Sequence, residues 1–419
     1  MWAGPRDVRH IGSIAGVLRT RAAVAVIATL VVLAPAAPAR AAFVCPQEFE
    51  IGKNSTATPY EDQLFAPDRL KPFATGAGVR VAVIDSGVDT RNPQLRAQVE
   101  RGRDFLHNNT DGRQDCVGHG TAVSSIIAAT PSEKAGLRGL APGVTIVPVR
   151  VSEQTDTPGG GTSGKPASPA RFAQAIVWAA SPSGGNADVI NMSLVMTENN
   201  TAVRTAVADA IAAGVVVVAA AGNDGEPKDG NPRPFPASYP GVIGVGAIDI
   251  NGVKPGFSQH GDYVDLMAPG VGVTIATPRG GQTTGGGTSF AAPFVSATAA
   301  LVHQRFPTLT PAQIARRILA TADPAPGGQR SDDYGVGVLN PYRALTETLG
   351  PETQPAVAPM VVHTNDPATI ALARRRAHAQ DMSLLVAAIG AGVVLLVVMV
   401  AAAIRHGRRR GWRPPSAAA

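Results

Sequence analysis

Short apolar segments alternate with helix-like segments between residues 79 and 342. The apolar segments are rich in valine and isoleucine and end in turn residues, as buried strands do. They lie at residues 79–87, 144–151, 187–194, 214–223 and 241–249, and the helix-like segments lie at residues 120–130, 169–180 and 200–214. Strands that are apolar on both faces and alternate with helices predict an α/β fold, with a parallel sheet covered by helices on both faces.

The two ends of the chain have a different hydrophobic pattern. In residues 1–41, four arginines precede an apolar run, and the small-residue sequence Ala39-Arg40-Ala41 follows it. This pattern predicts a secretory signal peptide cleaved after Ala41, with an uncleaved anchor as the alternative. Residues 382–404 carry no charge and are long enough to span a bilayer as a transmembrane helix. More arginines follow this stretch than precede it, which favours a cytoplasmic side for the basic tail 405–419.

The net charge of +6 comes mostly from these ends. Residues 42–380 hold 27 basic and 29 acidic side chains. This near balance gives no basic surface for nucleic acid. We expect the arginines of the tail to contact anionic lipid headgroups instead.

Cys45 and Cys116 are the only cysteines. An even number of cysteines in an exported chain favours one disulfide. Such a bond would close a loop of about 70 residues and add about 4 kcal/mol through loop-closure entropy. A two-cysteine metal site is the alternative, although no paired histidines accompany these residues.

The segment Gly285–Ala297 places three glycines and a Thr-Ser pair before a small-residue helix. Ser289 would lie at the N-terminus of that helix, where unpaired N–H groups and the helix dipole favour developing negative charge. Pro293 is expected within the first turn, where its missing N–H costs nothing. On this segment alone, an N-cap serine without a chemical role is the plainer interpretation.

Three further polar residues lie at junctions of the predicted sheet: Asp85 at the end of a strand, His119 before a helix, and Asn223 at the end of another strand. Each residue alone would be assigned a structural role. Together with Ser289 they supply a nucleophile, a base, an orienting carboxylate and an amide donor. Ligands of such folds bind beyond the carboxyl ends of the strands, where these residues would meet.

The motifs "VAVIDSGVD", "GHGTAV", "NMSL", "AAAGND" and "GTSFAAP" occur in this order across residues 79–345. They resemble the motifs of subtilisin-like serine proteases, the subtilases. The resemblance implies a subtilisin-like sheet with Asp85 as the orienting carboxylate, His119 as the general base and then acid, and Ser289 as the nucleophile. It makes Asn223 the oxyanion-hole donor beside the N–H of Ser289. It implies no metal or organic cofactor.

The resemblance also implies substrate-binding segments at residues 191–195 and 219–222, which would flank an extended peptide as an added strand. Among the residues assigned to this role are Ser193, Leu194, Val195 and Gly222. Many subtilases have glycine where Val195 stands, so we expect a narrower wall at the S1 pocket. The resemblance further suggests a cis peptide bond before Pro236. Other acidic and histidine side chains carry no motif and are interpreted as structural or solvated: Asp89, Asp104, Asp115, His107, His260 and His303.

The order of segments resembles the mycosins, membrane-anchored subtilases associated with type VII secretion systems. The expected organisation is a signal peptide (1–41), an N-terminal extension that wraps the catalytic domain (42–78), the catalytic domain (79–345), a Pro-containing linker (346–381), a transmembrane helix (382–404) and the tail (405–419). Residues 42–78 are too few for a removable prodomain with its own core.

The resemblance implies limited proteolysis of exported proteins outside the cell membrane, beside a type VII secretion membrane complex. The loops 152–169 and 224–236 and the transmembrane helix are the surfaces expected to contact that complex. Two alternatives remain open at this point. The chain could act mainly as a structural or assembly component with secondary catalysis, or as a protease that degrades environmental peptides.

Overall fold

The computed structural model describes residues 45, 49–107, 111–156, 162–163, 165–350 and 404–405. The predicted signal peptide lies outside these residues, as do most of the predicted linker, transmembrane helix and basic tail. Within the described ranges, no helix has the length and apolar character needed to cross a membrane.

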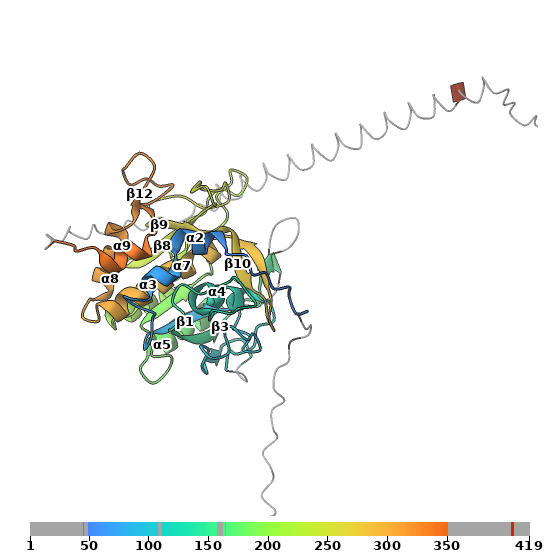
Figure 1. The fold of residues 1–419 in the computed structure, drawn as a ribbon, viewed down its shortest axis with the longest axis horizontal. Coiled ribbons are helices and arrows are strands. Elements are labelled where there is room, and N and C mark those ends of the chain that lie inside the picture. The colour runs from blue at the N-terminus through green and yellow to red at the C-terminus, as the bar shows by residue number, and fades with distance from the viewer. Residues whose placement is uncertain are drawn as a thin grey trace, which may run out of the picture. The chain divides into compact units, whose positions relative to one another are not determined.

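A nine-stranded sheet forms the centre of the described fold, in the order β12-β13-β9-β8-β7-β6-β1-β3-β2. Figure 1 labels β12, β9, β8, β1 and β3 among these strands. Every neighbouring pair is parallel except β12 and β13. The five predicted strands are confirmed as β1, β3, β6, β7 and β8. The strands of the sheet are β1 (Arg80–Asp85), β2 (Arg103–Asp104), β3 (Thr145–Arg150), β6 (Val189–Met192), β7 (Val216–Ala220), β8 (Val242–Ile248), β9 (Leu266–Pro269), β12 (Asp323–Pro324) and β13 (Gly337–Val338).

Helices cover both faces of this sheet, as predicted. Along β1, Val81 and Val83 pack into one hydrophobic cluster, whereas Ala82 and Ile84 pack into another. The first cluster includes α4 (His119–Ala128) and α7 (Thr288–Arg305), and the second includes α5 (Pro169–Ala180) and α6 (Thr201–Ala212). Alternate side chains of one strand therefore hold helices on opposite faces. Further short elements complete the described fold: α2 (Tyr60–Phe65), α3 (Pro67–Leu70), α8 (Pro311–Ala320), α9 (Pro341–Thr346), and the paired strands β4 (Thr155–Asp156) and β5 (Thr162–Ser163).

The N-terminal extension lies along an antiparallel hairpin formed by β10 (Val271–Ala276) and β11 (Gln282–Gly286). The N–H of Gly52 donates to the carbonyl of Gly280 at 2.9 Å, and the Tyr60 hydroxyl donates to the carbonyl of Val271 at 2.9 Å. Residues far apart in the sequence thus pack together, and the hairpin lies between the extension and helix α4.

Helix α7 begins two residues earlier than an N-cap at Ser289 would place it, with Gly287 as its N-cap and Thr288 as its first residue. Pro293 is therefore the sixth helical residue, and the expectation that it lies in the first turn is wrong. The backbone N–H of a sixth residue would normally pair with the carbonyl four residues earlier. In α7 that carbonyl belongs to Ser289.

Candidate active site

Asp85 and His119 form a direct contact at the carboxyl end of β1. The Nδ1 atom of His119 lies 2.8 Å from Oδ1 and 3.0 Å from Oδ2 of Asp85. The carboxylate is buried, whereas a quarter of the imidazole is exposed. Asp85 Oδ1 also accepts the N–H of Ser86 at 2.7 Å. A buried acceptor at Nδ1 keeps the proton on that nitrogen and leaves Nε2 as the basic atom of a neutral imidazole.

Helix α4 approaches β1 closely because its second residue is glycine. A Cβ atom at Gly120 would lie 2.1 Å from the carbonyl oxygen of Gly87 and 3.1 Å from Asp85 Cβ. Any larger residue would push the helix away. The glycine after His119 therefore sets the distance between the imidazole and the carboxylate.

Asp115 caps the N-terminus of α4, because the N-cap residue itself, Gly118, has no side chain that could do so. Its carboxylate accepts the N–H groups of Val117, Gly118 and Thr121 at 2.7–3.0 Å and the Thr121 hydroxyl at 2.6 Å. Burial raises the pKa of Asp115 above its usual value, while these donors lower it. The residue is structural, as expected, but its part in holding the start of the His119 helix was not foreseen.

Ser289 is buried at the N-terminal end of α7, with an exposed fraction of 8%. The ring of Phe290, the next residue, lies 5.4 Å from the His119 ring, measured between centroids. Helices α4 and α7 pack against each other. The start of the Ser289 helix therefore faces the imidazole that Asp85 holds.

Asn223 lies three residues beyond the end of β7, and its carboxamide is fixed by Thr288. Its Oδ1 accepts both the N–H and the hydroxyl of Thr288 at 2.9 Å. The Thr288 hydroxyl in turn accepts the N–H of Gly222 at 3.0 Å. Because Oδ1 caps the first N–H of α7, the Nδ2 group points to the other side.

Gly287 leaves open the space between these groups. A Cβ atom at this position would lie 3.1 Å from Ser289 Oγ and 3.2 Å from Asn223 Nδ2. The serine hydroxyl and the amide donor therefore border one small volume beside Gly287. This volume is where negative charge on a reacting carbonyl oxygen would be stabilised.

The segments predicted to bind substrate lie beside these residues. The Ser193 hydroxyl donates to the main-chain carbonyl of Ser289 at 2.8 Å. Leu194 packs against the α5–α6 cluster, and Val195 is 38% exposed. Gly222 has a positive φ of 99°, and a Cβ atom there would lie 1.8 Å from Gln259 Oε1. A glycine is required at this position by both conformation and packing.

Gln259 is a second residue that sequence reasoning missed. Its N–H donates to the carbonyl of Gly222 at 3.0 Å, and its side chain contacts the N–H of Asp224 and the carbonyl of Pro232. It therefore joins the Asn223 loop to loop 224–236. No motif surrounds it in the sequence, so only the folded chain reveals this role. The expected cis bond between Phe235 and Pro236 is confirmed in the same loop.

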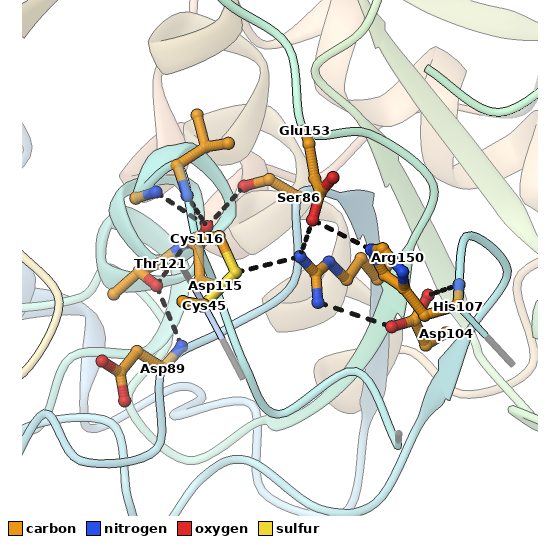
Figure 2. Close-up of a disulfide and its surroundings, with 12 residues drawn as sticks. Cys45, Ser86, Asp89, Asp104, His107, Asp115, Cys116, Thr121, Arg150 and Glu153 are labelled. Carbon is orange, nitrogen blue, oxygen red and sulfur yellow. Dashed lines mark hydrogen bonds and ion pairs between the residues drawn. A yellow bond between two sulfur atoms is a disulfide. The ribbon is translucent and has the colours of Figure 1, made fainter. Parts of the chain in front are cut away.

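The predicted disulfide between Cys45 and Cys116 is present (Figure 2). Because both cysteines are used, the alternative of a two-cysteine metal site is wrong. Cys116 lies three residues before His119, so the bond joins the N-terminal extension to the loop that leads into α4. Among the described residues, no group of three or more His, Cys, Asp or Glu side chains could hold a metal ion.

A buried ion-pair cluster supports the disulfide. Arg150 lies at the end of β3 and is fully buried. Its Nη2 atom lies 3.1 Å from Cys116 Sγ, and its guanidinium pairs with Asp104 and Glu153 (Figure 2). His107 Nε2 contacts the same Glu153 carboxylate at 3.0 Å. Asp104 and His107 are therefore structural rather than solvated, as is the buried Asp89, which pairs with Arg91.

Known proteins of similar sequence point to one family. Residues 76–337 match the Subtilase family. The chain is 38% identical over 285 residues to subtilisin E of Bacillus subtilis, which covers 68% of this chain and 70% of that protein. It is 38% identical over 342 residues to mycosin-1 of Mycobacterium tuberculosis, which covers 71% of this chain and 75% of that protein.

Solved mycosin structures have the same fold. A crystal structure of MycP1 with its N-terminal propeptide removed has a TM-score of 0.60 and 35% identity, and covers 71% of this chain and all of that one. MycP1 from Mycobacterium smegmatis has a TM-score of 0.61 and 31% identity, and covers 78% of this chain and 99% of that one. The chain therefore belongs to the subtilase family of serine proteases, with mycosins among its relatives.

Proposed function

We propose that this chain is a membrane-anchored, extracytoplasmic serine endopeptidase that cleaves exported proteins at limited sites, in association with a type VII secretion system. The observation that carries the proposal is the contact of His119 Nδ1 with both oxygens of the buried Asp85, beside the helix that begins with Thr288 and Ser289. Subtilase membership supports the class of reaction.

In the proposed reaction, Ser289 Oγ attacks the carbonyl carbon of the scissile peptide bond, and its proton passes to His119 Nε2. Asp85 holds the proton on Nδ1 and stabilises the imidazolium that forms. The carbonyl oxygen becomes an oxyanion and accepts hydrogen bonds from Asn223 Nδ2 and the N–H of Ser289.

The C–N bond then breaks, and His119 gives its proton to the departing amine. A water molecule attacks the acyl-enzyme and loses a proton to His119, which returns it to Ser289 Oγ as the ester bond breaks. The chain's own residues supply every proton transfer, and no cofactor takes part.

The sequence and the relatives support the proposed location. Residues 1–41 have a signal-peptide pattern, and residues 382–404 have the length and apolar character of one membrane span. One relative structure is described as MycP1 from the ESX-1 type VII secretion system, and another as MycP3 from the ESX-3 system. These observations support a single-pass topology with the catalytic domain outside the cell membrane.

The test uses cells that lack their own copy of this chain and carry either the wild-type chain or Ser289→Ala. New N-termini of exported proteins are identified by mass spectrometry, and secretion is measured in parallel. Cleavage products found only with the wild-type chain are expected. Identical products with both chains would refute the proposal, and normal secretion without cleavage in Ser289→Ala would favour the assembly role.

A further inference from the structure

Helix α7 has a proline where its second residue, Ser289, needs a hydrogen-bond donor. In an α-helix the carbonyl of residue i accepts the N–H of residue i+4. For Ser289 that residue is Pro293, which has no N–H and whose ring crowds this carbonyl. The carbonyl is attached to the residue that carries the proposed nucleophile, so its direction affects the reacting group.

Ser193 supplies a donor in place of the missing amide. Its hydroxyl donates to the Ser289 carbonyl oxygen at 2.8 Å. Both side chains are more than nine-tenths buried, with exposed fractions of 5% and 8%. Burying a carbonyl without a hydrogen-bond donor costs free energy, and the Ser193 hydroxyl avoids this cost by donating to the Ser289 carbonyl.

The direction of the Ser193 hydroxyl is itself fixed. Asn191 Nδ2 donates to Ser193 Oγ at 3.0 Å, which leaves the serine proton free to point at Ser289. Asn191 Oδ1 accepts the hydroxyl of Ser296 at 2.8 Å. The chain of hydrogen bonds starts on α7, passes through β6 and the loop after it, and returns to α7 at the nucleophile.

We propose that Ser193 is a positioning residue for Ser289, which replaces the amide that Pro293 lacks. The proposal rests on the proposed function. The hydroxyl sets the plane of the peptide group that follows Ser289, and thereby the backbone conformation of the residue from which Oγ projects. Ser193 also belongs to the segment proposed to flank the substrate, so one side chain links the substrate strand to the nucleophile.

The test compares the full-length chain with its Ser193→Ala variant, using a fluorophosphonate as the probe. Concentration dependence of labelling gives the maximal rate constant kinact and the apparent dissociation constant KI. Misplacement of a reacting group by about 1 Å costs up to about 100-fold in rate, so we expect a fall in kinact of about 10- to 100-fold with KI unchanged. The pH profile should keep its midpoint, because the Asp85–His119 contact is untouched.

Pro293→Ala provides the rescue because it restores a backbone N–H at position 293. The double variant Ser193→Ala/Pro293→Ala should recover most of the lost kinact. Thr298→Val is the matched control: the Thr298 hydroxyl is buried in the same helix and donates to the Phe294 carbonyl at 2.8 Å. This variant should label at the wild-type rate even if its thermal stability falls.

Unchanged kinact in Ser193→Ala would overturn the proposal, as would an equal loss in Thr298→Val or a failure of Pro293→Ala to rescue. If the wild-type chain does not label at all, the proposed function fails. The free energy of unfolding then tests whether the Ser193 hydroxyl replaces the missing amide. Pro293→Ala should stabilise the Ser193→Ala chain more than it stabilises the wild-type chain. If Pro293→Ala stabilises both chains equally, the Ser193 hydroxyl does not replace the amide that Pro293 lacks, and the proposal is refuted.

Discussion

The buried Glu61 makes the attachment of the N-terminal extension dependent on pH. Its side chain is 3% exposed, and its Oε1 accepts the N–H of Thr274 on β10 at 2.8 Å. Burial raises the pKa of this carboxyl from 4.5 to about 7, with the neighbouring Asp62 adding to the rise and the Thr274 N–H opposing it. At neutral pH and above, the extension therefore carries a costly buried charge.

The sign of the effect follows from proton binding. Between about pH 4.5 and pH 7 the folded chain binds more protons at Glu61 than the unfolded chain does, so stability falls as the pH rises through this window. At about 1.4 kcal/mol per pH unit, the rise in pKa corresponds to about 3 kcal/mol. Glu61→Gln keeps the shape and the acceptor for Thr274 but removes the charge.

The assay is urea denaturation followed by tryptophan fluorescence, in a Ser289→Ala background that prevents self-cleavage. The gain in unfolding free energy from Glu61→Gln should be about 3 kcal/mol larger at about pH 8 than at about pH 4. Glu133→Gln, at an exposed position, controls for loss of a negative charge. An equal gain at both pH values would refute the reasoning about Glu61.

Three further predictions concern the site and its support. Asp85→Asn should lower kcat by about 10⁴-fold with the fold intact, because the amide favours the wrong imidazole tautomer; peptide hydrolysis measures this, and a loss under tenfold would contradict it. Gly287→Ala should abolish fluorophosphonate labelling while circular dichroism stays native, since the new Cβ would fill the volume beside Ser289 Oγ. Retained labelling would show that this volume is not used. The double variant Cys45→Ser/Cys116→Ser should lose about 4 kcal/mol of unfolding free energy, as expected for a closed loop of this length. Unchanged stability in urea would contradict the loop-closure argument.

The sequence allowed the parallel sheet and the main site residues to be predicted because both depend on local pattern. Asp85 and His119 stand at the ends of strongly patterned elements, so their meeting follows from the topology of a parallel sheet. The even cysteine count, together with the signal-peptide pattern of residues 1–41, was enough to predict the disulfide.

The parts that could not be predicted depend on contacts between distant segments. In the sequence, Asp115 cannot be told from any other loop aspartate; only the folded chain shows that its carboxylate accepts backbone N–H groups at the start of α4. Gln259 is distant in sequence from the Asn223 loop that its side chain contacts. The error at Pro293 arose from a shift of two residues in the helix start, since an N-cap at Gly287 rather than Ser289 moves the proline out of the first turn. Helix boundaries are set by capping contacts such as that of Asn223, which lie outside the local pattern.

The central claim is that Ser289 is a nucleophile activated by His119. The most direct measurement is to treat the full-length chain with a fluorophosphonate and to map the adduct by mass spectrometry, beside Ser289→Ala and His119→Ala. The account predicts one adduct, on Ser289, absent in the first variant and formed far more slowly in the second. No adduct on the wild-type chain, or an adduct that persists in Ser289→Ala, would contradict it.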